Sequence, residues 1–207
     1  MKLYDYAISG SCYKVRLLLD FLNLEYEAQQ IDFYPTKEHK GPDFLDINPL
    51  GQLPVLDDEG VVIWDAQAIL CHLANKYDQS NQWLPNDPQY FGQVMMWLAF
   101  AGDTLMASSE ARMHDMLGYD LDIEDARKRT YEALRVLDDH LVLRQVDSKK
   151  WIIGDSPTIA DIACFPYSAL SVQGGVGHED FPALRNWMRD IRRLHNFKAM
   201  PGIQEFV

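Results

Sequence analysis

The spacing of apolar residues changes once along this chain, and that change limits the folds that the chain can adopt. Up to residue 78, short apolar runs of strand type alternate with runs that have the helical period. Beyond residue 88 only the helical period occurs. The 207 residues suffice for two modest domains, each with its own core. We therefore predict an α/β domain over residues 1–78, a polar linker over 79–87 and an all-α domain over 88–207.

The N-terminal part predicts the order β-α-β, a long irregular loop, and then β-β-α. Strand-like runs lie at residues 2–6 and 26–31, and two more flank the turn signal at residues 58–60. The first helix is expected to begin near Ser11, because the apolar residues that follow recur at helical spacing. The second is expected to follow Asp65, whose side chain can cap a helix N-terminus.

The C-terminal part predicts four helices. A long helix opens at Asp87, which a proline follows, and presents one apolar face as far as Leu105. The next helix follows Asp122, and a third begins at Thr158, which forms a capping box with Asp161. The sequence after Thr158 is apolar nearly all round, so we expect that helix at the centre of the domain. The fourth helix carries Leu184, Trp187, Met188 and Ile191.

Composition argues against several kinds of partner and site. A formal charge of −12 would repel the phosphate backbone of a nucleic acid. No run approaches ~18 uninterrupted apolar residues, and the charges near the N-terminus do not fit a signal peptide. We therefore expect a cytoplasmic protein without a membrane partner. The three cysteines lie far apart and no Cys/His cluster occurs, which predicts neither a disulfide framework nor a metal site.

Five local patterns resemble the glutathione transferase superfamily, in particular its serine-type members, and together they extend over nearly the whole chain. In order they read SGSCYKVR (9–16), EHKGPDFL (38–45), NPLGQLPVL (48–56), DAQAIL (65–70) and TIAD (158–161). The resemblance implies an α/β thioredoxin-like N-terminal domain and an all-α C-terminal domain, which is the glutathione transferase fold. It also implies glutathione as co-substrate, a small apolar electrophile and a symmetric homodimer.

In the resembling proteins, a hydroxyl at the start of the first helix stabilises the glutathione thiolate. Ser9 stands at that position, and Ser11 is the alternative or auxiliary donor. Lowering a thiol pKa by about two units requires ~2.7 kcal/mol in favour of the anion. A helix N-terminus supplies up to ~2 kcal/mol, and a hydrogen bond to a charged acceptor adds ~1.5–3 kcal/mol. A hydroxyl donor there is therefore sufficient, although Ser9 taken alone would be interpreted as an N-cap.

The same resemblance assigns contacts along the glutathione tripeptide. His39 and Lys40 are expected to contact the glycine carboxylate, one by a hydrogen bond and one by charge. Gln52, Leu53 and Pro54 are expected along the peptide part. The resemblance also implies a cis peptide bond at Pro54, which would turn the backbone of Leu53 toward the ligand.

The γ-glutamyl end of glutathione is where the sequence departs from the family pattern. Asp65 is expected to contact the γ-glutamyl ammonium, while also capping its helix. Ala66 follows it, where the family usually has a serine that binds the γ-glutamyl carboxylate. Loss of that hydrogen bond costs ~1.5–3 kcal/mol. We expect the Gln67 N–H and the helix N-terminus to remain available to the carboxylate.

Cys12 admits two interpretations. Residues 9–12 have the spacing of a C-x-x-C motif whose attacking cysteine is replaced by Ser9, so Cys12 would take the resolving position. The alternative is a small packing residue. The pocket for the electrophile is expected between the domains, with four candidate lining residues that would also fit a plain helical core: Leu105, Met106, Ser109 and Arg112.

Three functions remain open from the sequence. The first is attack of the glutathione thiolate on small apolar electrophiles. The second keeps glutathione but reduces disulfides or peroxides. The third is a binding protein that retains the fold without catalysis, and Ala66 is the feature that favours it.

Overall fold

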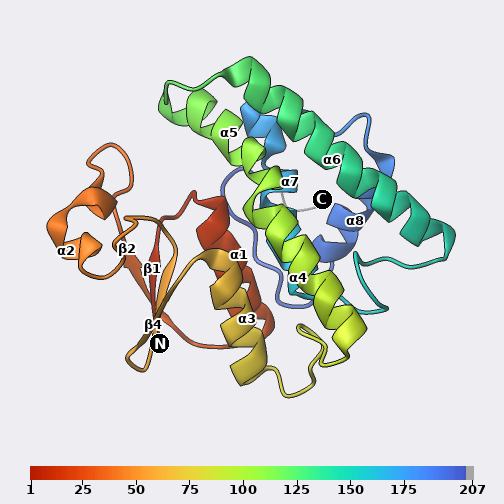
Figure 1. Ribbon diagram of the computed structural model, residues 1–207, viewed down its shortest axis with the longest axis horizontal. Coiled ribbons are helices and arrows are strands. Elements are labelled where there is room, and N and C mark those ends of the chain that lie inside the picture. Colours follow the sequence, from red (N-terminus) through yellow and green to blue (C-terminus); the bar gives the residue numbers. More distant parts are fainter. Residues whose placement is uncertain (204–207) are drawn as a thin grey trace.

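The computed structural model describes residues 1–203, which divide into a sheet-containing half and a helical half (Figure 1). The first half consists of β1 (Lys2–Asp5), α1 (Gly10–Phe21), β2 (Glu27–Gln30), the 3₁₀ helix η1 (Glu38–Lys40), α2 (Pro42–Leu45), β3 (Val55–Asp58), β4 (Val61–Trp64) and α3 (Ala66–Tyr77). This order confirms the predicted β-α-β, loop, β-β-α. The loop contains η1 and α2, two short elements that the sequence did not reveal.

The four strands form one sheet in the order β2-β1-β3-β4. β1 and β2 are parallel, and β3 pairs antiparallel with both β1 and β4. α1 supplies the crossover that a parallel pair needs. In Figure 1, α1 and α3 lie between the sheet and the helical half, so the N-termini of these two helices are close to the junction of the two halves. This is the thioredoxin-like arrangement that the resemblance implied.

The second half is entirely helical. It consists of α4 (Pro88–Gly102), the 3₁₀ helix η2 (Thr104–Met106), α5 (Ala107–Leu117), α6 (Ile123–Val146), α7 (Ile159–Ala169), the 3₁₀ helix η3 (Ser171–Gly174) and α8 (Pro182–Arg192). The side chains of Asp87, Asp122 and Thr158 accept hydrogen bonds from the first turns of α4, α6 and α7. These helices therefore begin where the sequence predicted, and the N-cap predicted at Thr158 is confirmed. Within residues 1–203, no helix combines the length and apolar character needed to cross a membrane.

The long helix predicted from Asp87 to Leu105 is shorter than expected. α4 ends at Gly102, and Asp103 leaves the helical conformation with φ −123° and ψ −81°. Gly102 lies against the Gln67 side chain so closely that a Cβ there would be 2.3 Å from the Gln67 Nε2 atom. The chain then passes through η2 and starts α5 in a new direction. The break thus coincides with the contact between Gly102 and Gln67, which joins the two halves. The spacing of apolar residues cannot predict such a contact.

α7 lies at the centre of the molecule and contacts α1, α3 and α4. All its residues are buried, as its apolar sequence predicted. The capping box of Thr158 and Asp161 is confirmed. The Asp161 carboxylate also accepts hydrogen bonds from the Ile152 N–H at 3.0 Å and from the Trp187 indole N–H at 2.8 Å. One buried carboxylate thus joins α7, α8 and the loop before α7. The role of Asp161 in this protein is therefore structural.

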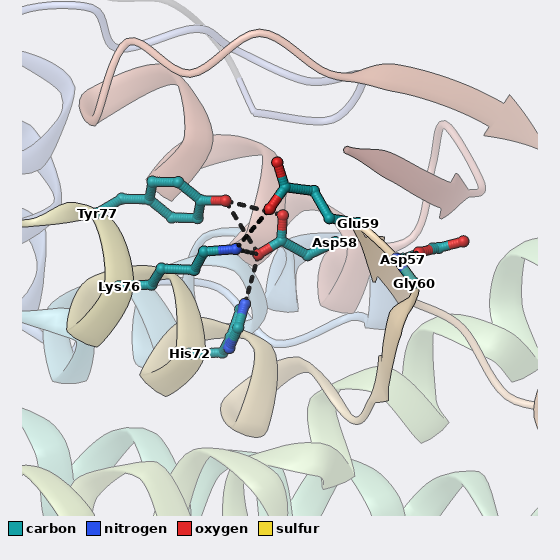
Figure 2. A network of polar contacts seen from close by, with 7 residues as sticks. All are labelled: Asp57, Asp58, Glu59, Gly60, His72, Lys76 and Tyr77. Carbon is teal, nitrogen blue, oxygen red and sulfur yellow. Dashed lines mark hydrogen bonds and ion pairs between the residues drawn. The ribbon is translucent and has the colours of Figure 1, made fainter.

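A second buried carboxylate, Asp58 at the end of β3, attaches the hairpin to α3 (Figure 2). Its oxygens accept hydrogen bonds from Lys76 at 2.8 Å and Tyr77 at 2.8 Å, and lie 2.7 Å from the His72 Nε2 atom. Burial alone would raise the pKa of Asp58. The hydrogen bonds from Lys76, His72 and Tyr77 outweigh it and lower the pKa to about 2.

The pKa of Asp58 predicts an acid-dependent contribution to stability. Because the folded pKa lies below that of a free carboxyl, the contribution is complete above about pH 4. It is lost as the pH falls toward the folded value of about 2. Asp58→Asn should lower the free energy of unfolding at pH 7 by about 1–3 kcal/mol. In urea denaturation, the difference between the wild type and this variant should shrink between pH 4 and pH 2.

Glu59→Gln is the matched control, because Glu59 belongs to the same hairpin but is 79% exposed in its side chain. It should change stability by less than about 0.5 kcal/mol at either pH. A difference between wild type and Asp58→Asn that stays constant down to pH 2 would contradict the role given to the Asp58 carboxylate.

Candidate functional site

A cleft of about 320 Å³ lies between the two halves. The sheet half contributes residues from the loop before α1, the start of α1, the loop after β2, the loop before β3 and the start of α3. The helical half contributes the end of α4, the end of η2, one face of α5 and a tyrosine of α7. The lining residues are Tyr6, Ile8, Ser9, Gly10, Ser11, Phe33, Gln52, Leu53, Pro54, Asp65, Ala66, Gln67, Gly102, Met106, Ser109, Arg112, Met113, Met116, Leu117 and Tyr167.

Most of the residues predicted for the site meet in this cleft. Seven of them line it, from three separate segments of the sheet half: Ser9, Ser11, Gln52, Leu53, Pro54, Asp65 and Ala66. His39 and Lys40 are not among the lining residues. The structure therefore brings together the expected hydroxyl, peptide and γ-glutamyl contacts, and places the expected glycine contacts outside the cleft.

Ser9 occupies the N-cap of α1. Its side-chain oxygen accepts a hydrogen bond from the Cys12 N–H at 3.2 Å. This contact uses a lone pair of the oxygen and leaves the hydroxyl proton for another acceptor. The N-cap interpretation and the catalytic interpretation of Ser9 are thus compatible, because one hydroxyl can accept from the helix and donate to a ligand.

The loop before Ser9 is held by its carbonyl groups. The Tyr6 carbonyl accepts from the Ser9 N–H at 2.9 Å, and the Ala7 carbonyl accepts from Arg16 at 2.9 Å. The Ile8 carbonyl accepts from Arg112 of α5 at 2.7 Å. Three successive carbonyls are therefore fixed, one of them by the helical half, and the position of Ser9 depends on both halves.

Ser11 has a different environment. Its hydroxyl lies 3.0 Å from the hydroxyl of Tyr167, which comes from the C-terminal end of α7. The Tyr167 ring lies so close to Gly10 that a Cβ at Gly10 would be 2.7 Å from it. Glycine is therefore the residue that permits this contact. Sequence reasoning missed Tyr167, because an aromatic residue in an apolar helix carries no signal that distinguishes it from the core.

The segment before β3 presents its backbone at the cleft. The Leu53–Pro54 peptide bond is cis, as the resemblance implied. The buried side chain of Asn48 fixes this segment, since its amide donates to the Gln52 carbonyl at 2.8 Å and its carbonyl oxygen accepts from the Leu50 N–H at 3.1 Å.

Asp65 caps α3 and lies at the edge of the cleft. One oxygen of its carboxylate accepts from the Gln67 N–H at 2.9 Å and from the Ala68 N–H at 3.0 Å. The Gln67 N–H, which we expected to be available to a ligand, is therefore already bonded, because the cap competes for it. The Asp65 backbone has φ 78° and ψ 126°, a strained conformation for a residue other than glycine. Such strain is concentrated at functional sites.

His39 and Lys40 lie in η1, directly before α2. His39 is 3% exposed and stacks on Phe33, with ring centroids 4.1 Å apart, while its Nδ1 atom has no hydrogen-bond partner. Burial, together with the charges of Lys40 and Lys37, lowers the pKa of His39. The Lys40 ammonium donates to the Leu50 carbonyl at 2.9 Å. Because Phe33 lines the cleft, His39 supports the cleft wall from behind.

Cys12 is fully buried, and burial raises the pKa of its thiol to about 12, with the charge of Asp5 acting in the same direction. A thiol of this kind is not ionised at neutral pH and is a poor nucleophile. The structure favours the interpretation of Cys12 as a packing residue. Within residues 1–203, no three His, Cys, Asp or Glu side chains are grouped as a metal site would require.

The helical wall of the cleft contains three of the four residues considered for the electrophile: Met106, Ser109 and Arg112. Leu105 is fully buried and does not line the cleft. Met113, Met116 and Leu117 line it as well, and the sequence did not identify them. Residues 109, 112, 113 and 116 share one face of α5 at helical spacing. That signal was readable only once α5 was known to be a separate helix.

Comparison with known proteins agrees with this geometry. Family models described as glutathione S-transferase N-terminal domain and C-terminal domain match residues 8–76 and 120–190. Glutathione S-transferase F13 of Arabidopsis thaliana is 26% identical, over 98% of this chain and 96% of its own length.

Two solved structures share the fold. A glutathione S-transferase from Pseudomonas fluorescens Pf-5 has a TM-score of 0.87 and 29% identity, over 97% of this chain and 98% of that one. Ure2p in complex with glutathione has a TM-score of 0.85 and 25% identity, over 94% and 91% of the two chains. The matched domains, the sheet order and the cleft between the halves lead to one conclusion. This chain belongs to the glutathione S-transferase superfamily.

Proposed function

We propose that the protein is a glutathione transferase that binds glutathione in the cleft and adds its thiolate to small, mainly apolar electrophiles. The observation that carries the proposal is the position of Ser9, whose hydroxyl caps α1 at the cleft wall with a proton left to donate. The peptide part of glutathione would lie along Gln52, Leu53 and Pro54. Its γ-glutamyl end would lie at Asp65, the one acidic side chain among the lining residues of the described chain.

The energetics of the site suffice for activation of the thiol. The N-terminus of α1 contributes up to ~2 kcal/mol toward the anion, and the hydroxyl of Ser9 contributes ~1.5–3 kcal/mol. Their sum covers the ~2.7 kcal/mol that a two-unit decrease in pKa requires. Ser11 is the auxiliary donor. Its hydroxyl forms a hydrogen bond with the hydroxyl of Tyr167. No general base is needed.

Exposed apolar residues support a homodimer. Val61, Val62 and Trp64 of the edge strand β4 are 41–52% exposed, and Tyr90, Phe91 and Met96 of α4 are 44–57% exposed. Large exposed apolar side chains on an edge strand and on a helix of the other half are typical of surfaces that meet between subunits.

A glutathione-binding protein without catalysis is the second candidate, and Ala66 is the observation that favours it. Ala66 lines the cleft with no side-chain hydrogen-bonding group, and the cap by Asp65 occupies the next two N–H groups of α3. Reduction of disulfides or peroxides by glutathione would use the same site. The raised pKa of Cys12 argues against a reductase that acts through a thiol of its own.

Ser9 is the sharpest test of the proposed chemistry. Ser9→Ala should raise the pKa of bound glutathione by one unit or more, because ~1.5–3 kcal/mol of hydrogen bonding corresponds to one to two units. Conjugation at neutral pH should slow correspondingly, with glutathione affinity little changed. The measurement is thiolate absorbance of bound glutathione against pH.

Ser9→Thr is the matched control for this substitution, because it keeps both the hydroxyl and the cap. It should retain most of the pKa shift. Ser11→Ala should have a smaller effect than Ser9→Ala, and Cys12→Ala almost none. If Ser11→Ala abolishes the shift while Ser9→Ala preserves it, Ser11 is the donor. Loss of activity with Cys12→Ala alone would overturn the proposal.

Ala66→Ser should tighten glutathione binding by roughly tenfold or more, since it restores a hydroxyl at the γ-glutamyl carboxylate. Wild-type affinity should lie in the high micromolar range or above. Calorimetric titration of both proteins measures the difference, with Ala68→Ser, two residues along the same helix and exposed, as the control. Unchanged or weaker binding would place the γ-glutamyl carboxylate elsewhere.

His39 lies behind Phe33 and Lys40 donates to the Leu50 carbonyl, both outside the cleft. They should therefore affect glutathione binding through the cleft wall and leave the chemical step unchanged. Alanine at either position should raise KM for glutathione with little change in kcat, as expected when ground state and transition state are affected alike. Lys37→Ala, at the exposed N-cap of η1, should leave both constants unchanged. A large decrease in kcat at constant KM would contradict the assignment.

A further inference from the structure

The two walls of the cleft differ in charge. Among the lining residues of the described chain, Asp65 and Arg112 carry formal charges. Asp65 belongs to the sheet half, where the glutathione ammonium is proposed to bind. Arg112 belongs to the helical half, where the remaining lining residues include Met106, Met113, Met116 and Leu117. The wall that faces the electrophile is therefore largely apolar, with the hydroxyls of Ser109 and Tyr167 and a single cation.

Arg112 is buried without a counter-ion. It is 8% exposed, and no acidic side chain of residues 1–203 forms an ion pair with it. Its Nε atom donates to the Gln173 side chain at 2.6 Å and its Nη1 atom donates to the Ile8 carbonyl at 2.7 Å. Its Nη2 atom has no hydrogen-bond partner.

An arrangement of this kind is costly unless something neutralises it. Burial lowers the pKa of Arg112. Because arginine nevertheless remains charged in proteins, the loss of hydration of this charge destabilises the folded state. An unpaired buried donor adds a further penalty. A ligand carboxylate can neutralise the charge and accept from the free nitrogen at once. The remaining donors of Arg112 already hold it in one orientation.

We propose that the natural co-substrate is an apolar electrophile that carries a carboxylate or a comparable oxyanion, which Arg112 binds. This inference rests on the proposed transferase function and names the substrate class of the same cleft. Through Ile8, Arg112 is attached to the residue before Ser9, where the glutathione sulfur would lie. The anion would therefore bind in the same cleft as the thiolate, on the helical wall that contacts the loop before Ser9.

The apolar lining suits the body of such a substrate. The Nη2 atom is shielded from solvent, so the ligand reaches it by displacing neighbouring side chains. Met113 and Met116 border the same wall, and methionine side chains repack at low cost. The carboxylate orients the substrate and takes no part in bond making.

The test uses two electrophiles that share one skeleton and differ in the charge of the para substituent: 4-(chloromethyl)benzoate and its methyl ester. In both, the glutathione thiolate attacks the benzylic carbon, a C–S bond forms, the C–Cl bond breaks and chloride leaves with the electron pair. Each kcat/KM is divided by the uncatalysed rate constant with glutathione. The wild type should then prefer the carboxylate by roughly tenfold to a hundredfold, the value of a charge-assisted hydrogen bond.

Variants at Gln173 test the charge without removing Arg112. Gln173→Glu puts a carboxylate next to the Arg112 Nε atom and should reduce the preference to about threefold or less, because the cation is then paired internally. Gln173→Met, which loses the same hydrogen bond without adding charge, should retain the preference. Arg112→Met should abolish the preference. Because Arg112 also holds the Ile8 carbonyl, absolute turnover is expected to change in this variant, so the acid-to-ester ratio within each protein is compared and circular dichroism reports folding.

A binding measurement separates failure of the inference from failure of the proposed function. Calorimetry compares S-(4-carboxybenzyl)glutathione with its methyl ester. Equal binding of both adducts, or equal normalised turnover of both electrophiles, would overturn the anion site and leave the transferase standing. Preferential binding of the acid without turnover would support the anion site and remove the transferase activity. If neither adduct binds and neither electrophile reacts, both proposals fail.

Discussion

The burial of α7 is the constraint on which the rest of this structure depends. Both halves pack against this helix, and the Asp161 carboxylate fixes its start with bonds from Thr158, Ile152 and Trp187. A carboxylate that is fully buried must have its hydrogen bonds satisfied, so the geometry around Asp161 is tightly defined. The far end of the helix then places Tyr167 against Gly10 and Ser11, so the position of α7 also sets the position of the N-terminus of α1.

The cleft that results combines two different kinds of surface. The sheet half offers backbone and polar groups at the ends of helices and strands, which suit an extended charged peptide. The helical half offers the methionines of α5 with one buried arginine. Arg112 also donates a hydrogen bond to the Ile8 carbonyl, in the loop before Ser9, and so connects the two surfaces next to Ser9. In the proposed function, the sheet half would bind the peptide and the helical half would select the electrophile.

Burial distinguishes the two residues of the first motif that could carry thiolate chemistry. Ser9 lies at the N-cap and faces the cleft, whereas Cys12, one turn later, faces the core and has a thiol pKa of about 12. The helix N-terminus favours an anion at both places, but for Cys12 the loss of hydration is the larger effect. The same few residues therefore support a serine-type site that acts on the thiol of a ligand and not on a thiol of the protein.

The sequence by itself determined the four strands, most of the longer helices and the caps of those helices, because these depend on local periodicity and on side chains within one turn. Asp65, Asp87, Asp122 and Thr158 begin helices where the sequence predicted, and the apolar helix after Thr158 is central. The tertiary structure alone decided the break after Gly102, the position of His39 behind Phe33, and the approach of Tyr167 and Arg112 to the α1 loop. Each of these depends on contacts between residues far apart in the chain, and no local pattern encodes such distances.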